Sequence, residues 1–151
     1  MVVGLAVLAS AVVGIVVLSG DSNETSTASE SQTSDMSAMP ADLQGAIERA
    51  IARQSMENVY VLDVRTDAEW NEEHAAGAVH WGLVEHLENG EMPDIPLDAE
   101  IYVTCRSGNR AGQAIKIMQD AGFTNLTNIG GLTDWVSAGG ATATGVDGSD
   151  Q

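Results

Sequence analysis

The segment from Ile101 to Gly112 reads IYVTCRSGNRAG, and it predicts a strand, a tight loop and the first turn of a helix in direct succession. Its apolar, β-branched start is typical of a buried strand, and the strand runs straight into Cys105. From Arg110 to Ala121, apolar residues recur at the spacing of one helix face. A six-residue loop that begins with Cys105 and closes with Arg110 therefore joins the strand to the helix.

The rest of the chain repeats this alternation of strand and helix. Short apolar runs predict strands at 59–64, 77–81, 100–104 and 126–129, and helical periodicity predicts helices at 42–54, 67–74, 83–88, 110–121 and around Trp135. Strands that alternate with helices pair in parallel and carry helices on both faces of the sheet. The sequence thus predicts an α/β fold, with the Cys105 loop at the carboxyl edge of the sheet, where such sheets bind ligands.

The loop has the composition of an anion site around a reactive sulfur. Backbone N–H groups at the start of the helix have no helical acceptor, and with the helix dipole they favour a thiolate at Cys105. Arg106 and Arg110 add positive charge, and Gly108 permits a backbone turn that other residues resist. We therefore expect Cys105 to be an activated nucleophile. The alternative is a small buried side chain at a strand end, a common place for cysteine, but that role needs neither flanking arginines nor a glycine.

Composition excludes several classes of protein. The chain has 151 residues, which matches one domain, and 44% of them are hydrophobic, enough for one core. Cys105 is the only cysteine, so an intrachain disulfide and a thiolate-cluster metal site are excluded. A net charge of −16 repels phosphate backbones and argues against nucleic-acid binding. We expect so acidic a unit to be a monomer, and its charge fits a saline habitat.

The two ends of the chain differ from its middle. Residues 1–20 contain an uncharged apolar run from Val2 to Leu18, which predicts a signal peptide or an N-terminal membrane anchor. Residues 21–39 are rich in Ser, Thr and acidic residues and predict a flexible linker. We place the folded domain at 40–140 and expect 141–151 to be a disordered acidic tail. The protein is accordingly expected to be exported, either periplasmic or membrane-anchored on the extracytoplasmic side.

Several short motifs, taken in order, resemble those of the rhodanese family of single-domain sulfurtransferases, and they cover essentially residues 59–139. They are Leu62-Asp63-Val64-Arg65 at a strand end, Glu69-Trp70, His74, Gly77-Ala78, the Cys-Arg-x-Gly-x-Arg loop from Cys105 to Arg110, and Gly122 to Leu126 leading to Gly130-Gly131 and Trp135. The resemblance implies a small rhodanese-like α/β domain with a central, mostly parallel sheet of about five strands.

The resemblance also implies a reaction and a set of site residues. In the family, the loop cysteine takes sulfane sulfur from a donor such as thiosulfate, holds it as a persulfide and passes it to cyanide or a thiol. By position, Cys105 would carry the sulfur, and the loop residues after it would bind the donor through two arginine side chains and backbone N–H groups: Arg106, Ser107, Gly108, Asn109 and Arg110. This double displacement requires no metal, flavin or nucleotide cofactor.

Two other functions fit the same loop. One is a non-enzymatic persulfide carrier or protein-interaction module, which would use the fold to dock a partner. The enzyme itself could also pass its sulfur to a protein acceptor. The other is a cysteine phosphatase. Phosphatases that resemble this architecture have an arginine where this chain has Ala111, whereas here four residues separate Cys105 from Arg110. The shorter loop favours a sulfur atom over a tetrahedral phosphate.

The remaining polar and aromatic residues are expected to be structural. Asp63, Arg65 and Glu69 should form a charge pairing beneath the loop. The histidines are expected to be ordinary partly buried or surface residues, because their spacing does not converge on a metal: His74, His80 and His86. The tryptophans are expected to pack in the core and at its rim and not to stack on a ligand: Trp70, Trp81 and Trp135.

Overall fold

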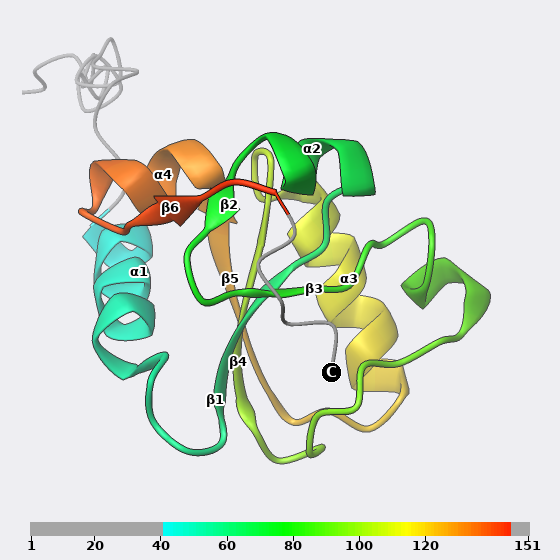
Figure 1. Cartoon of the computed structure of the whole chain (residues 1–151). Helices are drawn as coiled ribbons and strands as arrows, with labels where there is room; N and C mark the ends of the chain where they lie inside the picture. Colours follow the sequence, from blue (N-terminus) through cyan, green and yellow to red (C-terminus); the bar gives the residue numbers. More distant parts are fainter. Residues whose placement is uncertain (1–40, 146–151) are drawn as a thin grey trace, which may run out of the picture. The chain divides into compact units, whose positions relative to one another are not determined.

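Helices cover both faces of a four-stranded sheet in residues 41–145, the part of the chain that the computed structural model describes (Figure 1). The segments assigned from the sequence to a signal peptide or anchor (1–20) and to a linker (21–39) lie outside these residues. Between 41 and 145, no helix is both long and apolar enough to cross a membrane.

The central sheet consists of parallel strands in the order β3-β1-β4-β5. These strands are β1 (Val59–Asp63), β3 (Val79–His80), β4 (Glu100–Cys105) and β5 (Asn125–Gly131). The predicted α/β fold with a parallel central sheet is confirmed, with four strands in the sheet among the described residues. Two further segments, β2 (His74–Ala75) and β6 (Thr142–Ala143), form a separate antiparallel pair.

The helices divide between the two faces of the sheet. Figure 1 shows α1 (Ala41–Arg53) and α4 (Leu132–Ser137) on one side and α3 (Asn109–Asp120) on the other. The longer helices bury the apolar stripe that predicted them, and that stripe includes Ile47 on α1 and Met118 on α3. Two short elements lie in the connections: α2 (Asp67–Glu72) and the 3-10 turn η2 (Leu87–Asn89).

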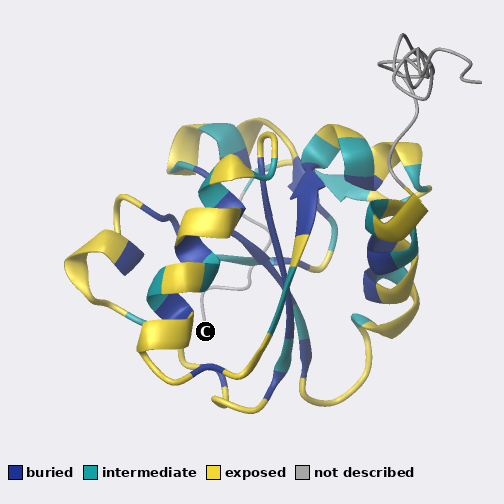
Figure 2. Cartoon of the chain, turned by 180° about the vertical axis from the view of Figure 1, so that it is seen from behind, coloured by how far each residue is buried: buried dark blue, intermediate teal, exposed yellow. Residues whose placement is uncertain are grey.

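The core consists of two apolar clusters, one on each face of the sheet. Along β4, Ile101, Val103 and Cys105 belong to the cluster under α3, whereas Tyr102 belongs to the cluster under α1. This is the alternation that a strand imposes on successive side chains. Burial of both faces explains why β4 is continuously apolar from Ile101 to Val103, and Figure 2 shows the central strands in the buried colour. The side chain of Cys105 therefore lies on the α3 side of the sheet.

The expectation that residues 141–151 form a disordered tail is wrong for its first part. The carbonyl of Ala141 accepts hydrogen bonds from the backbone N–H of Ala76 (2.9 Å) and from Nε1–H of Trp135 (2.8 Å). Thr142 and Ala143 then pair with β2. A two-residue strand has no periodicity of its own, and its partner lies far away in the sequence, so no local pattern indicates it. Residues 146–151 lie outside the described residues.

Two predicted helices are shorter than expected. The helix predicted at 67–74 ends at Glu72, because Glu73 is extended and His74 begins β2. The helical stretch predicted at 83–88 is a series of turns that closes with η2 at 87–89. Trp135 is fully buried and Trp70 nearly so, as expected, and the ring of Trp70 stacks on His74 and His80.

Candidate functional site

The candidate site lies where the carboxyl ends of β1 and β4 meet. These strands pair in parallel, with Asp63 beside Thr104, so the residues that follow each strand emerge at the same edge. Arg65 follows β1, and the Cys105 loop follows β4. The predicted position of the loop at the ligand-binding edge of the sheet thus agrees with the topology.

Cys105 is the last residue of β4 and is completely buried. Its Sγ accepts a hydrogen bond from the backbone N–H of Gly108 at 3.1 Å. The next element is α3, a 12-residue helix that begins at Asn109. Because the first amides of a helix have no helical acceptor and its N-terminus carries partial positive charge, this setting stabilises negative charge on the sulfur.

The loop keeps its shape through contacts with β5. Gly108 adopts a left-handed conformation (φ 84°), which a glycine tolerates best. Asn128 then joins loop and strand: its Nδ2 donates to the carbonyl of Gly108 (2.8 Å), and its Oδ1 accepts from the N–H of Gly130 (2.9 Å). Pairing between β4 and β5 shifts by one residue here, which places Gly131 beside Cys105. This β-bulge brings the β5 backbone against the loop.

Arg110, predicted to close the loop, lies in the first turn of α3 and is bound to α2. Its two terminal nitrogens donate to the two carboxylate oxygens of Glu69, each at 2.7 Å. Glu69 also completes a capping box with Thr66 at the start of α2. The hydrogen bonds from Arg110, and less strongly those from Thr66, lower the pKa of Glu69 from its ordinary 4.5 to about 2, against the opposing effect of burial. The same bonds raise the pKa of Arg110.

Arg65 forms a separate buried ion pair. Its guanidinium donates to the carboxylate of Asp63 at distances from 2.7 to 3.0 Å and to the carbonyl of Glu73 at 2.7 Å. The expected charge pairing of Asp63, Arg65 and Glu69 is therefore two pairings. Asp63 binds Arg65, while Glu69 binds Arg110, a residue 41 positions away.

Arg106 differs from the other two arginines of the site. It directly follows Cys105 and is exposed, and no carboxylate in the described part of the chain forms an ion pair with it. Ser107 and Asn109 are exposed on the same loop. The five predicted donor-binding residues thus lie together after Cys105. The side chain of Arg110, however, is bound to Glu69.

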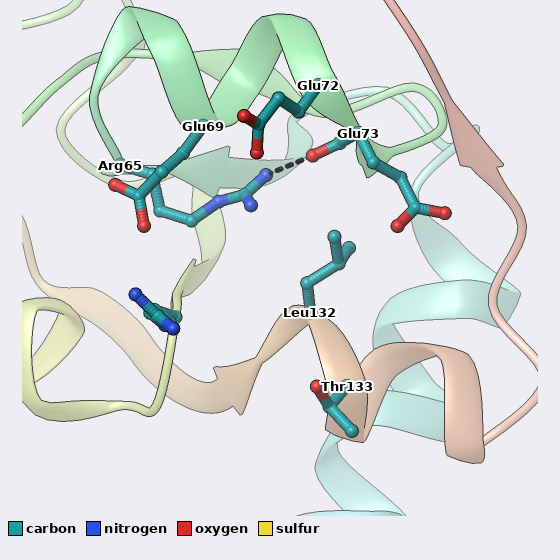
Figure 3. Close-up of a pocket in the computed structure, with 7 residues that line it drawn as sticks. Arg65, Glu69, Glu72, Glu73, Leu132 and Thr133 are labelled. Carbon is teal, nitrogen blue, oxygen red and sulfur yellow. Dashed lines mark hydrogen bonds between the residues drawn. The ribbon is translucent and has the colours of Figure 1, made fainter.

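A pocket of about 430 Å³ opens beside the loop. Figure 3 shows Glu69, Glu72 and Glu73 on the α2 side of the pocket and Leu132 and Thr133 of α4 on the opposite side. Its lining residues are Arg65, Glu69, Glu72, Glu73, Arg106, Leu132 and Thr133. No group of three or more His, Cys, Asp or Glu side chains within 41–145 has the arrangement of a metal site.

Several of these residues were not identified from the sequence. Asn128, Glu72, Glu73, Leu132 and Thr133 reach the site only through the packing of β5, α2 and α4, and no motif indicates them. Glu69 was expected in a charge pairing beneath the loop, and it has a further local signal because Thr66 and Glu69 have the spacing of a capping box. That signal predicts a helix start but not the bond to Arg110.

Comparison with known proteins gives consistent matches. The family model of the Rhodanese-like domain matches residues 44–138. Thiosulfate sulfurtransferase PspE of Escherichia coli is 35% identical over 75 residues, which are 48% of this chain and 70% of that protein. Adenylyltransferase and sulfurtransferase uba4 of Ogataea parapolymorpha is 29% identical over 102 residues, and these span 67% of this chain but only 25% of that protein.

A solved structure described as a rhodanese with anions from E. coli has the same fold. It superposes with a TM-score of 0.50 at 29% sequence identity, over 58% of this chain and 99% of that one.

Proposed function

The chain belongs to the rhodanese family, and we propose that it is a sulfurtransferase in which Cys105 carries sulfane sulfur as a persulfide. The donor is thiosulfate or a similar compound, and the acceptor is a thiol or cyanide. The observation that carries this proposal is the position of Cys105, at the end of β4 with its Sγ hydrogen-bonded by the loop amide of Gly108. The similarity to PspE, a thiosulfate sulfurtransferase by name, supports the choice of donor.

In the first half-reaction, the Cys105 thiolate attacks the outer sulfur of thiosulfate. The new bond joins Sγ to that sulfur, the sulfur–sulfur bond of thiosulfate breaks, and sulfite leaves with the bonding electron pair. Arg106, whose charge no described carboxylate neutralises, binds the donor's anionic oxygens. The backbone N–H groups of residues 106–110 and the start of α3 stabilise the persulfide anion that results.

In the second half-reaction, the acceptor attacks the outer sulfur of the persulfide. The Cys105–sulfur bond breaks, and the Cys105 thiolate leaves with its electron pair, ready for another cycle. A thiol acceptor leaves as a persulfide and cyanide leaves as thiocyanate. Arg110 takes part by position: its bonds to Glu69 hold the end of the loop against α2.

The surroundings of Ala111 argue against a phosphatase. This residue occupies the position at which the phosphatases that the loop resembles carry their arginine, yet Ala111 is fully buried in the apolar cluster that also contains Cys105. The neighbouring Arg110 directs its guanidinium to Glu69 and not toward the sulfur. The loop therefore lacks a free arginine at its end to bind a transferring phosphoryl group.

Mass spectrometry of the intact protein tests the proposal. After incubation with thiosulfate and removal of the donor, the chain should gain the mass of one sulfur atom, and added cyanide should remove it as thiocyanate. Cys105→Ser should abolish both steps. No added sulfur on the parent protein would refute the proposal. Loading without release to cyanide or to any small thiol would favour the persulfide carrier instead.

The role of Arg106 has its own test. Arg106→Ala should lower kcat/KM for thiosulfate by about 10- to 100-fold, because a hydrogen bond to a charged group contributes roughly 1.5–3 kcal/mol. Arg49→Ala is the matched control, since Arg49 is an exposed arginine on α1 that forms no ion pair with any described residue. Equal loading rates for Arg106→Ala and the control would exclude Arg106 from donor binding.

A further inference from the structure

The pocket beside the loop has more negative than positive side chains once the ion pairs among its residues are set aside. Arg65 is neutralised by Asp63, and Glu69 is neutralised by Arg110. Neither pair presents a free charge to a ligand. Three lining residues remain to decide what the pocket attracts, and they are Arg106, Glu72 and Glu73.

Two of these three are acidic, and no described basic side chain forms an ion pair with either of them. Glu73 accepts a hydrogen bond from the Thr142 hydroxyl at 2.8 Å, which orients its carboxylate without neutralising it. Glu72 forms no ion pair with any residue between 41 and 145. Both glutamates are exposed and lie on the α2 side of the pocket, above Leu132 and Thr133 (Figure 3). The cation, Arg106, belongs to the sulfur loop.

The pocket can therefore bind an anionic, an apolar and a cationic group of one small molecule at different lining residues. Arg106 adjoins the cysteine and suits an anionic sulfur, Leu132 offers an apolar contact, and the two glutamates suit a positive charge. A volume of about 430 Å³ is in the range of small-molecule sites. We propose that this pocket binds the sulfur acceptor and selects thiols that carry an ammonium group, with Glu72 and Glu73 as the residues that determine this specificity.

This inference rests on the proposed function, because it names the acceptor class for the second half-reaction. The thiolate of the aminothiol bonds to the outer persulfide sulfur, the bond to Cys105 breaks, and the Cys105 thiolate leaves with the electron pair. The ammonium group keeps its proton throughout and contributes through its charge. An acceptor with carboxylates is repelled by the same two side chains.

The test isolates the second half-reaction. Protein loaded with sulfur and freed of donor is mixed with one of three small thiols: cysteamine, 2-mercaptoethanol or 3-mercaptopropionate. They carry a positive, a neutral and a negative group. The rate of sulfur loss from the protein is followed by intact mass and expressed per thiolate present. We expect cysteamine to react faster than 3-mercaptopropionate by at least about fivefold, the effect of one opposite charge roughly 4 Å away in water.

The variants Glu72→Gln and Glu73→Gln should each reduce this preference, by slowing the reaction with cysteamine and speeding the reaction with 3-mercaptopropionate. The glutamine oxygen can still accept the Thr142 hydroxyl, so Glu73→Gln removes the charge and keeps the bond. Glu57→Gln is the matched control. Glu57 is exposed and precedes β1, at the edge of the sheet opposite the loop. High salt should weaken the preference of the parent protein as well.

The outcomes separate this inference from the proposed function. Equal rates for the three thiols in the parent, or a preference that Glu72→Gln and Glu73→Gln leave unchanged, would overturn the acceptor assignment alone. A protein that takes up no sulfur from thiosulfate or from inorganic polysulfide would overturn the proposed function and the acceptor assignment with it.

Discussion

Gly131 shows how closely the sulfur loop is packed. Its φ of −111° is open to any residue, so the backbone conformation does not require glycine. The requirement is steric: a Cβ at this position would overlap the carbonyl oxygen of Arg106 and lie 2.7 Å from the carbonyl carbon. The atoms in the way are backbone atoms of the loop itself, which the Gly108–Asn128 bond also holds. A side chain at 131 must therefore displace the loop.

Gly131→Ala should lower the free energy of unfolding by about 1–3 kcal/mol, the usual effect of overpacking a tight site. It should also slow sulfur loading, because the amide that bonds to Sγ moves with the loop. Urea unfolding and the loading rate measure the two effects.

Gly112→Ala provides the comparison for this substitution. Gly112 is exposed on α3, and its Cβ would make only an ordinary contact, 3.7 Å from Nδ2 of Asn128. Alanine favours a helix over glycine by roughly 0.5–1 kcal/mol, so this variant should match or exceed the parent in stability. Equal stability of the two variants would show that the loop has room to move.

Sequence reasoning at the residue scale identified the sulfur loop but not its supports. Cys105 was identified because strand, loop and helix signals are all local to residues 101–112. The pair Gly130-Gly131 was visible as a motif, but the motif does not show why glycine is needed there. The need arises from the β-bulge that places Gly131 against Arg106, and this bulge depends on pairing with β4. Asn128 has no signal at all, since its bond to the carbonyl of Gly108 joins segments 20 residues apart.

Among the elements, α2 and the loop are joined by one ion pair whose strength depends on pH. The pKa of Glu69 is lower in the folded protein, about 2, than the 4.5 expected when it is free. A lowered pKa means that folding favours the ionised carboxylate. This stabilisation is present above pH 4.5 and is lost as the pH falls toward 2.

Glu69→Gln should therefore be less stable than the parent at pH 7, and the difference should shrink as the pH falls from about 4.5 toward 2. We expect a loss on the order of 1 kcal/mol at pH 7, less than the lowered pKa alone implies. The side chains of Arg110 and Glu69 are 27% and 25% exposed, so water screens the pair. Urea unfolding of both proteins across this pH range measures the difference in their free energies of unfolding. A difference that stays constant down to pH 2 would contradict the prediction.

Elements with their own apolar periodicity were predicted to within a few residues, as α1, α3, β1 and β4 show. Those that depend on distant partners were not. The pair β2 and β6 holds only two residues on each side, and α2 stops early because His74 enters that pair. Such short segments are defined by tertiary hydrogen bonds and not by propensity.

For the molecule as a whole, the dominant physical property is negative charge. Residues 41–145 contain 16 acidic and six basic residues, and only Arg53, Arg65 and Arg110 of the basic ones form ion pairs with carboxylates there. The excess acidic side chains repel one another in the folded state. Added salt shortens the range of that repulsion, from roughly 30 Å at 0.01 M to about 8 Å at 0.15 M.

The melting temperature should therefore rise with salt. A gain on the order of 1 kcal/mol corresponds to a shift of about 4–8 °C for a domain of this size. Equal shifts in NaCl and KCl would indicate screening and not a bound cation. A melting temperature that is constant or falls with salt would contradict this expectation and, with it, the interpretation of the acidic surface as an adaptation to saline surroundings.

The α/β fold and the placement of the sulfur loop followed from the sequence, because both depend on strand and helix periodicity and on the carboxyl-edge rule. The pocket and its charge did not follow. They depend on which acids remain unpaired after folding. That is decided by the packing of α2 against α4 and by the ion pairs with Asp63 of β1 and Arg110 of α3.

The course of the chain after β6 has a practical consequence for anyone preparing this protein. The N–H of Gly145 donates to the carbonyl of Asn71, which directly precedes two of the glutamates that line the pocket. A purification tag or a fused partner attached just after Gly145 would start at the rim of the pocket. A polyhistidine extension there would bring imidazole side chains, a part of which are protonated near neutral pH, close to Glu72 and Glu73. Kinetic work on acceptor thiols should therefore use protein from which such an extension has been removed.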